Sequence, residues 1–449
     1  MKGMRGFFVL CLIVFMTMSV NSRAVAGDGD AMLNIMLKKG IITEEEYKDM
    51  LKALQAEEED KQVRHNTQIA EAIAYNKEEK EEGWTDRISL SGLMEGEYRW
   101  RRRKDVSDKT SGSTSDLYMR RLELGVGAKL TDWMKADAVI NSEFIGDAVN
   151  NPDNEANVVV DQATITLQRE DFPLYLVMGK RAQPFGVFEN LLVTDPMTQD
   201  AFETKRVGLT IGATGPWELD VSATLYKGEE QMDHLVGSGL FEVTRAGATA
   251  ADNVNSYILS ASVSPFKDHL KLFAGYLSEP GRGDDRNTTM NMGFNASMPG
   301  LKNLRLYGEY MKALQREKYD GLNEAFKEGI FSITAVYAFN HGDSESKEGD
   351  EGGPTFAERM RQVLEAPVEL ALRYEHFDDD DLAEKTASWS VEHRYSIGLR
   401  YPFYRDEEKG LAAFVATEYR HTDYRLHSSL KDVRADNNKE VFVKLGVAF

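Results

Sequence analysis

Hydrophobic and polar positions alternate with a period of two residues over most of the chain after about Trp84. Between Ile88 and Trp100, apolar residues occupy one face, and Ser, Glu and Arg residues occupy the other. This run is longer than an ordinary strand of about 5–6 residues. Both its length and its alternation are typical of a tilted strand that crosses a bilayer. The pattern therefore predicts strands with one face toward lipid and the other toward water.

The same alternation recurs near residues 122–130, 391–401, 411–420 and 441–449. In the second of these segments Val391 is predicted to lie on the apolar face with Tyr395. Charged groups on alternate positions of an apolar strand need water on one side, which a wet barrel lumen supplies. The candidate lumen-facing residues are Glu95, Glu97, Arg99, Arg121, Glu123, Lys129, Glu392, Arg394, Glu418 and Lys444.

Connections between the predicted strands alternate between short turns and longer polar segments. The long segments lie near residues 101–116, 145–157, 181–204, 227–252, 279–288, 313–327, 378–387 and 422–438. Short periplasmic turns and long outer loops are expected of outer-membrane barrels. We predict an all-β, antiparallel transmembrane barrel of about sixteen strands over residues 84–449. Residues 340–366 are long for a periplasmic turn, which leaves the count open by one hairpin.

Residues 1–26 have the build of a secretory signal peptide. Lys2 and Arg5 precede the apolar run Phe7–Met18, and the small residues Ala24 and Ala26 mark a cleavage site. Cys11, the only cysteine, lies inside this segment, so the mature chain is predicted to fold without disulfides.

Residues 27–83 are predicted to form a periplasmic helical segment. Thr43–Glu46 has the spacing of a capping box, and Tyr47, Met50, Leu51 and Leu54 fall on one helix face. The stripe fades after Leu54, which leaves two interpretations for residues 30–82. They form a solvated linker, or a short coiled coil that trimerises a porin or spaces it from the cell wall.

Composition narrows the possible functions. The 449 residues carry 54 Lys and Arg against 74 Asp and Glu, a net charge of −20, with a mean hydropathy of −0.45. An acidic chain without a basic stripe is a poor nucleic-acid binder. No His-Glu-x-x-His, Gly-x-Ser-x-Gly or Walker-type run occurs. We therefore predict no enzyme activity, no cofactor and no bound metal.

Two segments resemble known families. The alternating strand that ends in Phe449 resembles the C-terminal signature of Gram-negative outer-membrane barrels, which implies the barrel assembly machinery as a partner. The run Gly179–Thr204, with Pro184-Phe185-Gly186 and Asp195-Pro196-Met197-Thr198, resembles the siderophore porins of the legiobactin-uptake (LbtU) family. That resemblance implies a sixteen-stranded barrel with a periplasmic helical prefix, and passage of ferric siderophores without a plug domain. Pro-Phe-Gly after a strand also occurs in phosphate-selective and other sixteen-stranded porins.

The segment 181–204 is the candidate constriction. It either folds into the channel as an eyelet or packs outside it as a rim loop. Its candidate charges are Lys180, Arg181, Glu189, Asp195, Glu203, Lys205 and Arg206; such charges set ion selectivity through their local potential.

Two further charge clusters lie at strand ends. The basic cluster at Arg99 and residues 101–104 contacts lipopolysaccharide phosphates, attracts anionic substrates or forms a solvated rim. The acidic run Asp378–Asp381 is a solvated loop or a divalent-cation site.

The sequence thus favours a passive porin in the outer membrane of a Gram-negative bacterium, with its N-terminal segment in the periplasm. Ferric siderophores or general small solutes are the candidate cargo, and an anion-selective porin or a structural barrel that anchors the envelope is the alternative. Outer-membrane lipid and lipopolysaccharide are expected neighbours. A homotrimer is a common state of such barrels, although no motif here establishes it.

Overall fold

The computed structural model describes residues 87–102, 112–148, 157–242, 253–267, 269–282, 285–298, 303–318, 324–339, 368–406 and 410–449. The predictions for residues 1–26, 27–83 and 340–366 lie outside these ranges. Among the described residues no helix is both long and apolar enough to cross a membrane.

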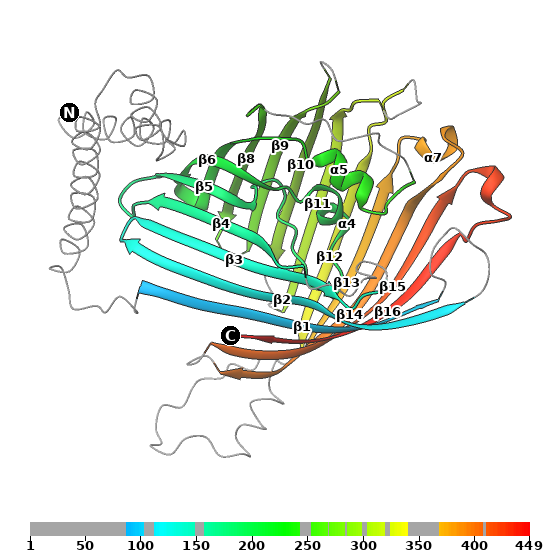
Figure 1. Cartoon of the computed structure of the whole chain (residues 1–449), viewed down its shortest axis with the longest axis horizontal. Coiled ribbons are helices and arrows are strands. Elements are labelled where there is room, and N and C mark those ends of the chain that lie inside the picture. Colours follow the sequence, from blue (N-terminus) through cyan, green and yellow to red (C-terminus); the bar gives the residue numbers. More distant parts are fainter. Residues whose placement is uncertain are drawn as a thin grey trace, which may run out of the picture. The chain divides into compact units, whose positions relative to one another are not determined.

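The described residues form sixteen strands that close into one antiparallel barrel (Figure 1), which confirms the predicted fold class. Each strand pairs with its neighbours in sequence, and β1 pairs with β16 to close the ring. The strands are β1 (Ile88–Arg102), β2 (Ser113–Thr131), β3 (Met134–Ile145), β4 (Val159–Gln168), β5 (Leu174–Ala182), β6 (Lys205–Gly215), β7 (Leu219–Tyr226), β8 (Ser256–Phe266), β9 (Leu270–Pro280), β10 (Arg286–Ser297), β11 (Leu304–Gln315), β12 (Gly329–Phe339), β13 (Val368–Asp378), β14 (Trp389–Asp406), β15 (Leu411–Leu426) and β16 (Asn437–Ala448).

The period-two pattern sorts side chains between the two faces of this wall. On β16, Leu445 and Val447 are exposed on the outside, whereas Glu440 and Lys444 are buried on the inside. The outer face of the wall is thus apolar and the inner face charged. Strands that have water on neither side would not carry this alternation.

The ring is closed at its seam by the C-terminal residue. Phe449 exchanges two backbone hydrogen bonds with Gly92, of 2.8 and 3.0 Å. The ring of Phe449 lies over Gly92, where an added Cβ atom would come within 2.3 Å of it. A glycine at this position therefore gives the terminal aromatic ring its place against β1.

Among the described residues, three short α-helices lie in the long connections: α4 (Met197–Phe202), α5 (Gln231–Gly237) and α7 (Leu382–Lys385). The connections that follow the odd-numbered strands leave one end of the barrel, called here the long-loop end. Helices α4 and α5 pack against each other within the barrel (Figure 1). Their side chains form an apolar cluster with the inner wall, which includes Phe185, Phe202, Met232, Leu235 and Phe377, all essentially without solvent exposure. Part of the lumen is therefore packed like a protein core.

Two of the register shifts in the described strands change which face of the wall nearby side chains occupy. The register of β2 shifts between the partners of Glu95 and Gly96, and the register of β14 shifts between Val391 and His393. A bulge inserts one residue into a strand and thereby moves the following side chains to the other face. For this reason Val391, predicted on the apolar outer face, instead lies in the interior cluster with 1% exposure.

Candidate functional site: a loop clamped across the barrel

The connection between β5 and β6, residues 183–204, enters the barrel and reaches its opposite wall; we call it the crossing loop. A backbone hydrogen bond from Gln183 to Thr204, 2.8 Å long, holds its two ends together. The side-chain nitrogen of Gln183 also donates to the carbonyl of Arg206 over 2.6 Å. The loop is therefore closed at its base, and the intervening residues project inward as a unit.

Two buried carboxylates bind backbone N–H groups at the tip of the crossing loop, Val193–Met197. Glu418 on β15 accepts from the backbone nitrogen of Thr194 at 2.7 Å and from its hydroxyl at 2.8 Å. Glu375 on β13 accepts from the backbone nitrogen of Met197 at 2.6 Å. Hydrogen bonds to ionised acceptors are stronger than neutral ones. The wall thus satisfies tip donors that have no partner within the loop.

Two cations bind the carbonyl groups of the same tip. Arg373 on β13 donates to the carbonyls of Thr194 and Asp195, at 2.9 and 3.2 Å. Lys444 on β16 donates to the carbonyl of Val193 at 3.2 Å. Arg373 also contacts both acceptor carboxylates, with nitrogen–oxygen distances of 3.3 Å to Glu375 and 3.8 Å to Glu418. We call this set, Arg373, Glu375, Glu418 and Lys444, the tip clamp.

Side-chain ion pairs lie on either side of the clamp. Asp195 pairs with Arg120 of β2 at 3.3 Å, and Asp200 on α4 pairs with Arg394 of β14 at 3.3 Å. Asp195 also accepts from Asn190 within the loop, at 2.6 Å. These contacts distribute the attachment of one loop over β2, β13, β14, β15 and β16.

The bulge in β2 places two consecutive arginines on the inner face. Arg120 and Arg121 both pair with Glu143 of β3, at 3.3 and 3.2 Å. Regular alternation would have sent Arg120 outward. The bulge instead directs it to Asp195, so an irregularity of the wall supplies one attachment of the crossing loop.

Apolar contacts complete the docking. Val193 packs with Ala416 and Phe442 of β15 and β16, and Leu191 and Leu192 pack against Tyr307, Val336 and Ala371. An added Cβ atom on Gly398 of β14 would meet Leu192 at 2.6 Å, so this glycine leaves room for the loop. The crossing loop therefore divides the lumen at the level of its tip.

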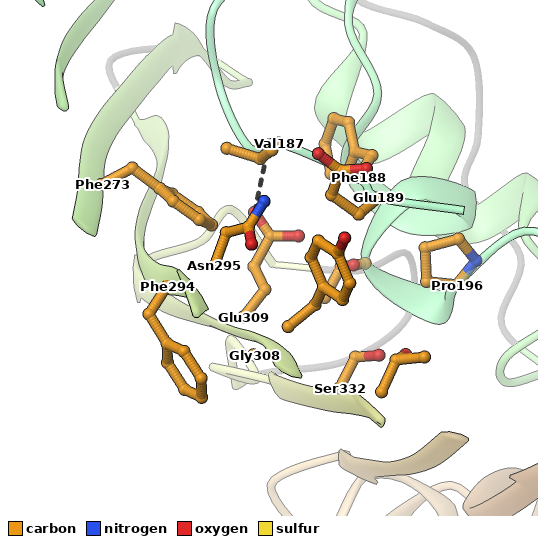
Figure 2. A pocket seen from close by; sticks show the side chains of 13 residues that line it. Val187, Phe188, Glu189, Pro196, Phe273, Phe294, Asn295, Gly308, Glu309 and Ser332 are labelled. Atoms are coloured by element: carbon orange, nitrogen blue, oxygen red, sulfur yellow. Dashed lines mark hydrogen bonds between the residues drawn. The ribbon is translucent and has the colours of Figure 1, made fainter. Parts of the chain in front are cut away.

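A cleft remains between the crossing loop and the wall of β9–β12 (Figure 2). Phe188, Phe273 and Tyr307 contribute aromatic rings to it, and Glu189 and Glu309 contribute carboxylates. Glu309 is held in place because it accepts from the backbone nitrogen of Val187 at 3.1 Å. Glu189 is exposed, and none of the thirteen lining residues is basic. This side of the loop is therefore acidic, unlike the ion-paired clamp side.

One loop carboxylate has a perturbed acidity. Burial raises the pKa of Asp200 to about 6, and the nearby carboxylates Asp195 and Glu375 act in the same direction, although Arg394 and Arg420 oppose them. Removing a charge from water disfavours its ionised form. Asp200 consequently titrates in the mildly acidic range while the loop is docked.

The structure places the predicted constriction residues in different surroundings. Asp195 lies at the clamped tip, Glu189 borders the cleft, and Arg206 pairs with Glu230 near α5 at 3.0 Å. Arg181 faces inward and donates to Thr210 at 3.1 Å. Glu203 pairs with Lys205 at 3.8 Å, and Lys205 also pairs with Asp161 at 2.9 Å.

The prediction that Lys180 lies at the constriction is wrong. It shares the outward side of Met178, and its Nζ donates to the carbonyl of Val160 over 2.7 Å, so it does not border the constriction. Lys205 likewise shares the outward side of the exposed Val207 at the start of β6. The strand period of two, counted from the apolar residues of β5 and β6, was the signal that would have separated both lysines from Arg181 and Arg206.

Six of the predicted lumen residues are buried on the inner face: Glu95, Glu97, Arg99, Arg394, Glu418 and Lys444. Arg121 and Glu123 are half-buried there, and Lys129 is an exposed residue at the short-turn end, paired with Asp132 at 3.2 Å. Glu392 is the bulged residue of β14 and pairs with Arg425 at 3.5 Å. These residues hold the loop and the wall together more than they face free water.

The members of the two charge clusters at strand ends also lie in different surroundings. Arg99 pairs with Asp147 at 3.0 Å and Arg101 with Glu440 at 2.5 Å on the inner side, so neither faces lipid, whereas residues 103 and 104 lie outside the described ranges. Asp379 accepts from Ser390 at 2.7 Å and pairs with Arg425. Among the described residues no group of three His, Cys, Asp or Glu is placed to hold a metal ion.

Arg373, Glu375 and Arg120 were not among the predicted residues. The first two lie on the alternating segment Val368–Asp378, whose polar positions carry Glu369, Arg373 and Glu375. That alternation would have placed them on the inner face. No sequence signal indicated Arg120, because its orientation depends on the bulge.

A closed sixteen-stranded antiparallel barrel with an inward-folded loop after the fifth strand is the architecture of outer-membrane porins. The family model for phosphate-selective porin O and P matches residues 94–297, slightly less than half of the chain. The outer membrane channel DcaP of Acinetobacter baumannii is 13% identical, with 81% of this chain and 97% of that chain covered and a TM-score of 0.51. OmpF of Salmonella typhi, in complex with daunomycin, gives the same identity, coverage and TM-score: 13%, 81% and 97%, and 0.51. No protein of curated function matches the sequence.

Proposed function

We propose that this protein is an outer-membrane porin through which small hydrophilic solutes diffuse passively. The observation that carries the proposal is the tip clamp, which holds the crossing loop inside a closed barrel with a charged inner face and an apolar outer face. A loop fixed across a wet lumen narrows it at one level and so sets the size and charge of what passes. No covalent step is needed, and the chain acts without enzymatic chemistry.

Charge selectivity in this proposal comes from the cleft side of the crossing loop. The arginines and the lysine at the clamp are paired with carboxylates, which leaves little net charge there to attract anions. Glu189 is exposed in the cleft, and no hydrogen bond or ion pair with another described residue engages it. The similarity of residues 94–297 to phosphate-selective porins therefore supports the barrel and not phosphate selectivity. We expect a weak preference for cations.

Ferric siderophores are a narrower candidate cargo, supported by the resemblance of Gly179–Thr204 to siderophore porins. In the structure this run forms the crossing loop and its clamped tip. Its Asp195-Pro196-Met197 segment therefore has a role in docking whichever solute passes. The resemblance makes siderophore passage worth testing beside general diffusion.

Conductance of the refolded chain in a planar bilayer tests the proposal. We expect stable open steps and a reversal potential of cation-selective sign in a KCl gradient. Ferrioxamine, a ferric siderophore, and phosphate are then added separately to one side. Interruption of the steps by ferrioxamine alone would identify a siderophore channel, whereas unaffected steps indicate general diffusion. A folded barrel that produces no steps would overturn the channel proposal.

A further inference from the structure

The outer face of the barrel carries an unusual cluster of imidazole rings near the long-loop end of β13–β15. His376 and His393 are cross-strand partners, with ring centroids 4.8 Å apart. His393 also lies beside Tyr374 and Tyr395, with centroid distances of 5.9 and 6.2 Å. All four side chains point away from the lumen, since the neighbouring inward positions are Arg373, Glu375 and Arg394. Polar rings on an otherwise apolar face need a partner of their own.

The hydrogen bonds of this cluster fix one ring as a donor. The Nδ1 of His376 lies 2.9 Å from the carbonyl of Glu392 and 3.3 Å from the Nδ1 of His393. A carbonyl only accepts, so His376 carries its proton on Nδ1. The Nδ1 of His393 also lies 3.1 Å from the hydroxyl of Tyr374, which can donate to it. When the Nδ1 of His393 accepts that hydroxyl, the neutral ring carries its proton on Nε2, where it can donate to an external group.

Cations continue the row along the same face. His421 of β15 is the cross-strand partner of Lys439 on β16, and Lys439 is the partner of Arg102 on β1. Among the described residues no carboxylate pairs with Lys439 or Arg102, while Asp423 pairs with His421 at 2.9 Å. We call His376, His393, His421, Lys439 and Arg102 the donor row. From β13 to β1 this donor row spans about 19 Å at the usual strand spacing of about 4.8 Å. A ligand with more than one anionic group would match it.

An apolar groove begins directly below the donor row. Its floor is Ala335 of β12, a small residue between the larger side chains Ile333, Leu372 and Ile397. Its end nearest the donor row is formed by Tyr374 and Tyr395, the same rings that contact His393. The face therefore presents anion donors at the long-loop end and, adjoining them, a groove that runs toward the middle of the strands.

We propose that this face binds lipid A, the phosphorylated and acylated lipid of the outer leaflet, with phosphate on the donor row and an acyl chain in the groove. The inference rests on the outer-membrane location in the proposed function. Charge complementarity favours phosphate, and the groove favours a chain rather than a compact ion. Charge-assisted hydrogen bonds from Lys439 and Arg102 supply affinity, and the donor on His393 supplies position. The bound lipid covers imidazole groups that hydrocarbon alone would leave unpaired.

The test uses the full mature chain, refolded in a defined neutral detergent and titrated with hexa-acyl lipid A while native mass spectrometry counts bound lipid. His393→Ala combined with Lys439→Gln is expected to weaken binding about tenfold or more, since two charge-assisted or positioned donors are lost. Ala335→Phe fills the groove and should weaken binding similarly. The matched controls are Lys180→Gln and Ala163→Phe, at outward positions on the opposite wall, and these should bind as the parent does.

Three comparisons make the outcome decisive. Dephosphorylated lipid A and phosphatidylglycerol separate a requirement for phosphates from general lipid adhesion, and equal binding of all three would overturn the proposal. Equal affinity of the test and control variants would also overturn it. If Ala335→Phe instead changes the oligomeric state without changing lipid binding, the groove is an interface between copies. Conductance of each sample is measured in parallel, so a conducting protein that ignores lipid A refutes this inference and leaves the channel proposal standing.

Discussion

Replacing Glu418 with alanine should release the tip of the crossing loop. The residue is 1% exposed, and its side chain accepts two hydrogen bonds from Thr194, of 2.7 and 2.8 Å. Hydrogen bonds to a charged group contribute about 1.5–3 kcal/mol each. Losing both hydrogen bonds should weaken docking of the tip by about 3 kcal/mol or more. Glu375 and Lys444 still bind the two ends of the tip in this variant.

Amide hydrogen exchange measures this docking directly. A loss of about 3 kcal/mol corresponds to roughly a hundredfold faster exchange at the backbone nitrogen of Thr194, at about 1.4 kcal/mol per factor of ten. Single-channel recordings of the same variant should show larger and noisier open steps, because a released loop no longer fixes the narrow level. Glu418→Gln keeps one acceptor oxygen, so its exchange rate and channel noise should fall between those of the parent and of Glu418→Ala.

The control is Glu123→Gln, which removes a half-exposed inner-face carboxylate 3.9 Å from Arg121 and remote from the tip. It should leave both the exchange of Thr194 and the channel noise unchanged. If Glu418→Ala exchanges at the parental rate and conducts as the parent does, the tip clamp does not hold the loop, and the reasoning is refuted.

Three further predictions follow from other contacts. Glu189→Lys reverses the exposed charge of the cleft and should shift the reversal potential in a KCl gradient toward anions by several millivolts or more, an effect that fades at high salt; an unchanged potential would place the conducting path elsewhere. Because docking raises the pKa of Asp200 from its ordinary value near 4 to about 6, lowering the pH from 7 to 5 should stabilise the docked loop and quieten the channel, and Asp200→Asn should be quiet at both values; a parent channel that becomes noisier on acidification would show the sign to be wrong. Deleting Phe449 removes both backbone hydrogen bonds to Gly92 and should lower the yield of heat-modifiable folded barrel, whereas Phe449→Tyr, which keeps them, should fold normally.

The sequence determined the barrel itself. Strands in a membrane must pair every backbone polar group by hydrogen bonds, which a closed ring achieves, and must sort their side chains between lipid and water. Both requirements are local and periodic, so the alternation at Leu445, Val447 and Lys444 and the spacing of the turns were enough to predict about sixteen strands, with the count open by one hairpin near residues 340–366. The same periodicity would have separated Lys180 from Arg181. Applied to the segment Val368–Asp378, it would also have placed Arg373 and Glu375 on the inner face.

The tertiary structure alone decided what the inner charges do. Whether Glu418 faces water or a loop depends on where the tip of the crossing loop lies, and that position is set by partners on β2 and β13–β16, far away in sequence. Bulges decide orientation in the same non-local way, because an inserted residue is accommodated only against a paired neighbour. Arg120 therefore turns inward and Val391 becomes part of the interior cluster, although simple alternation assigns both to the outside.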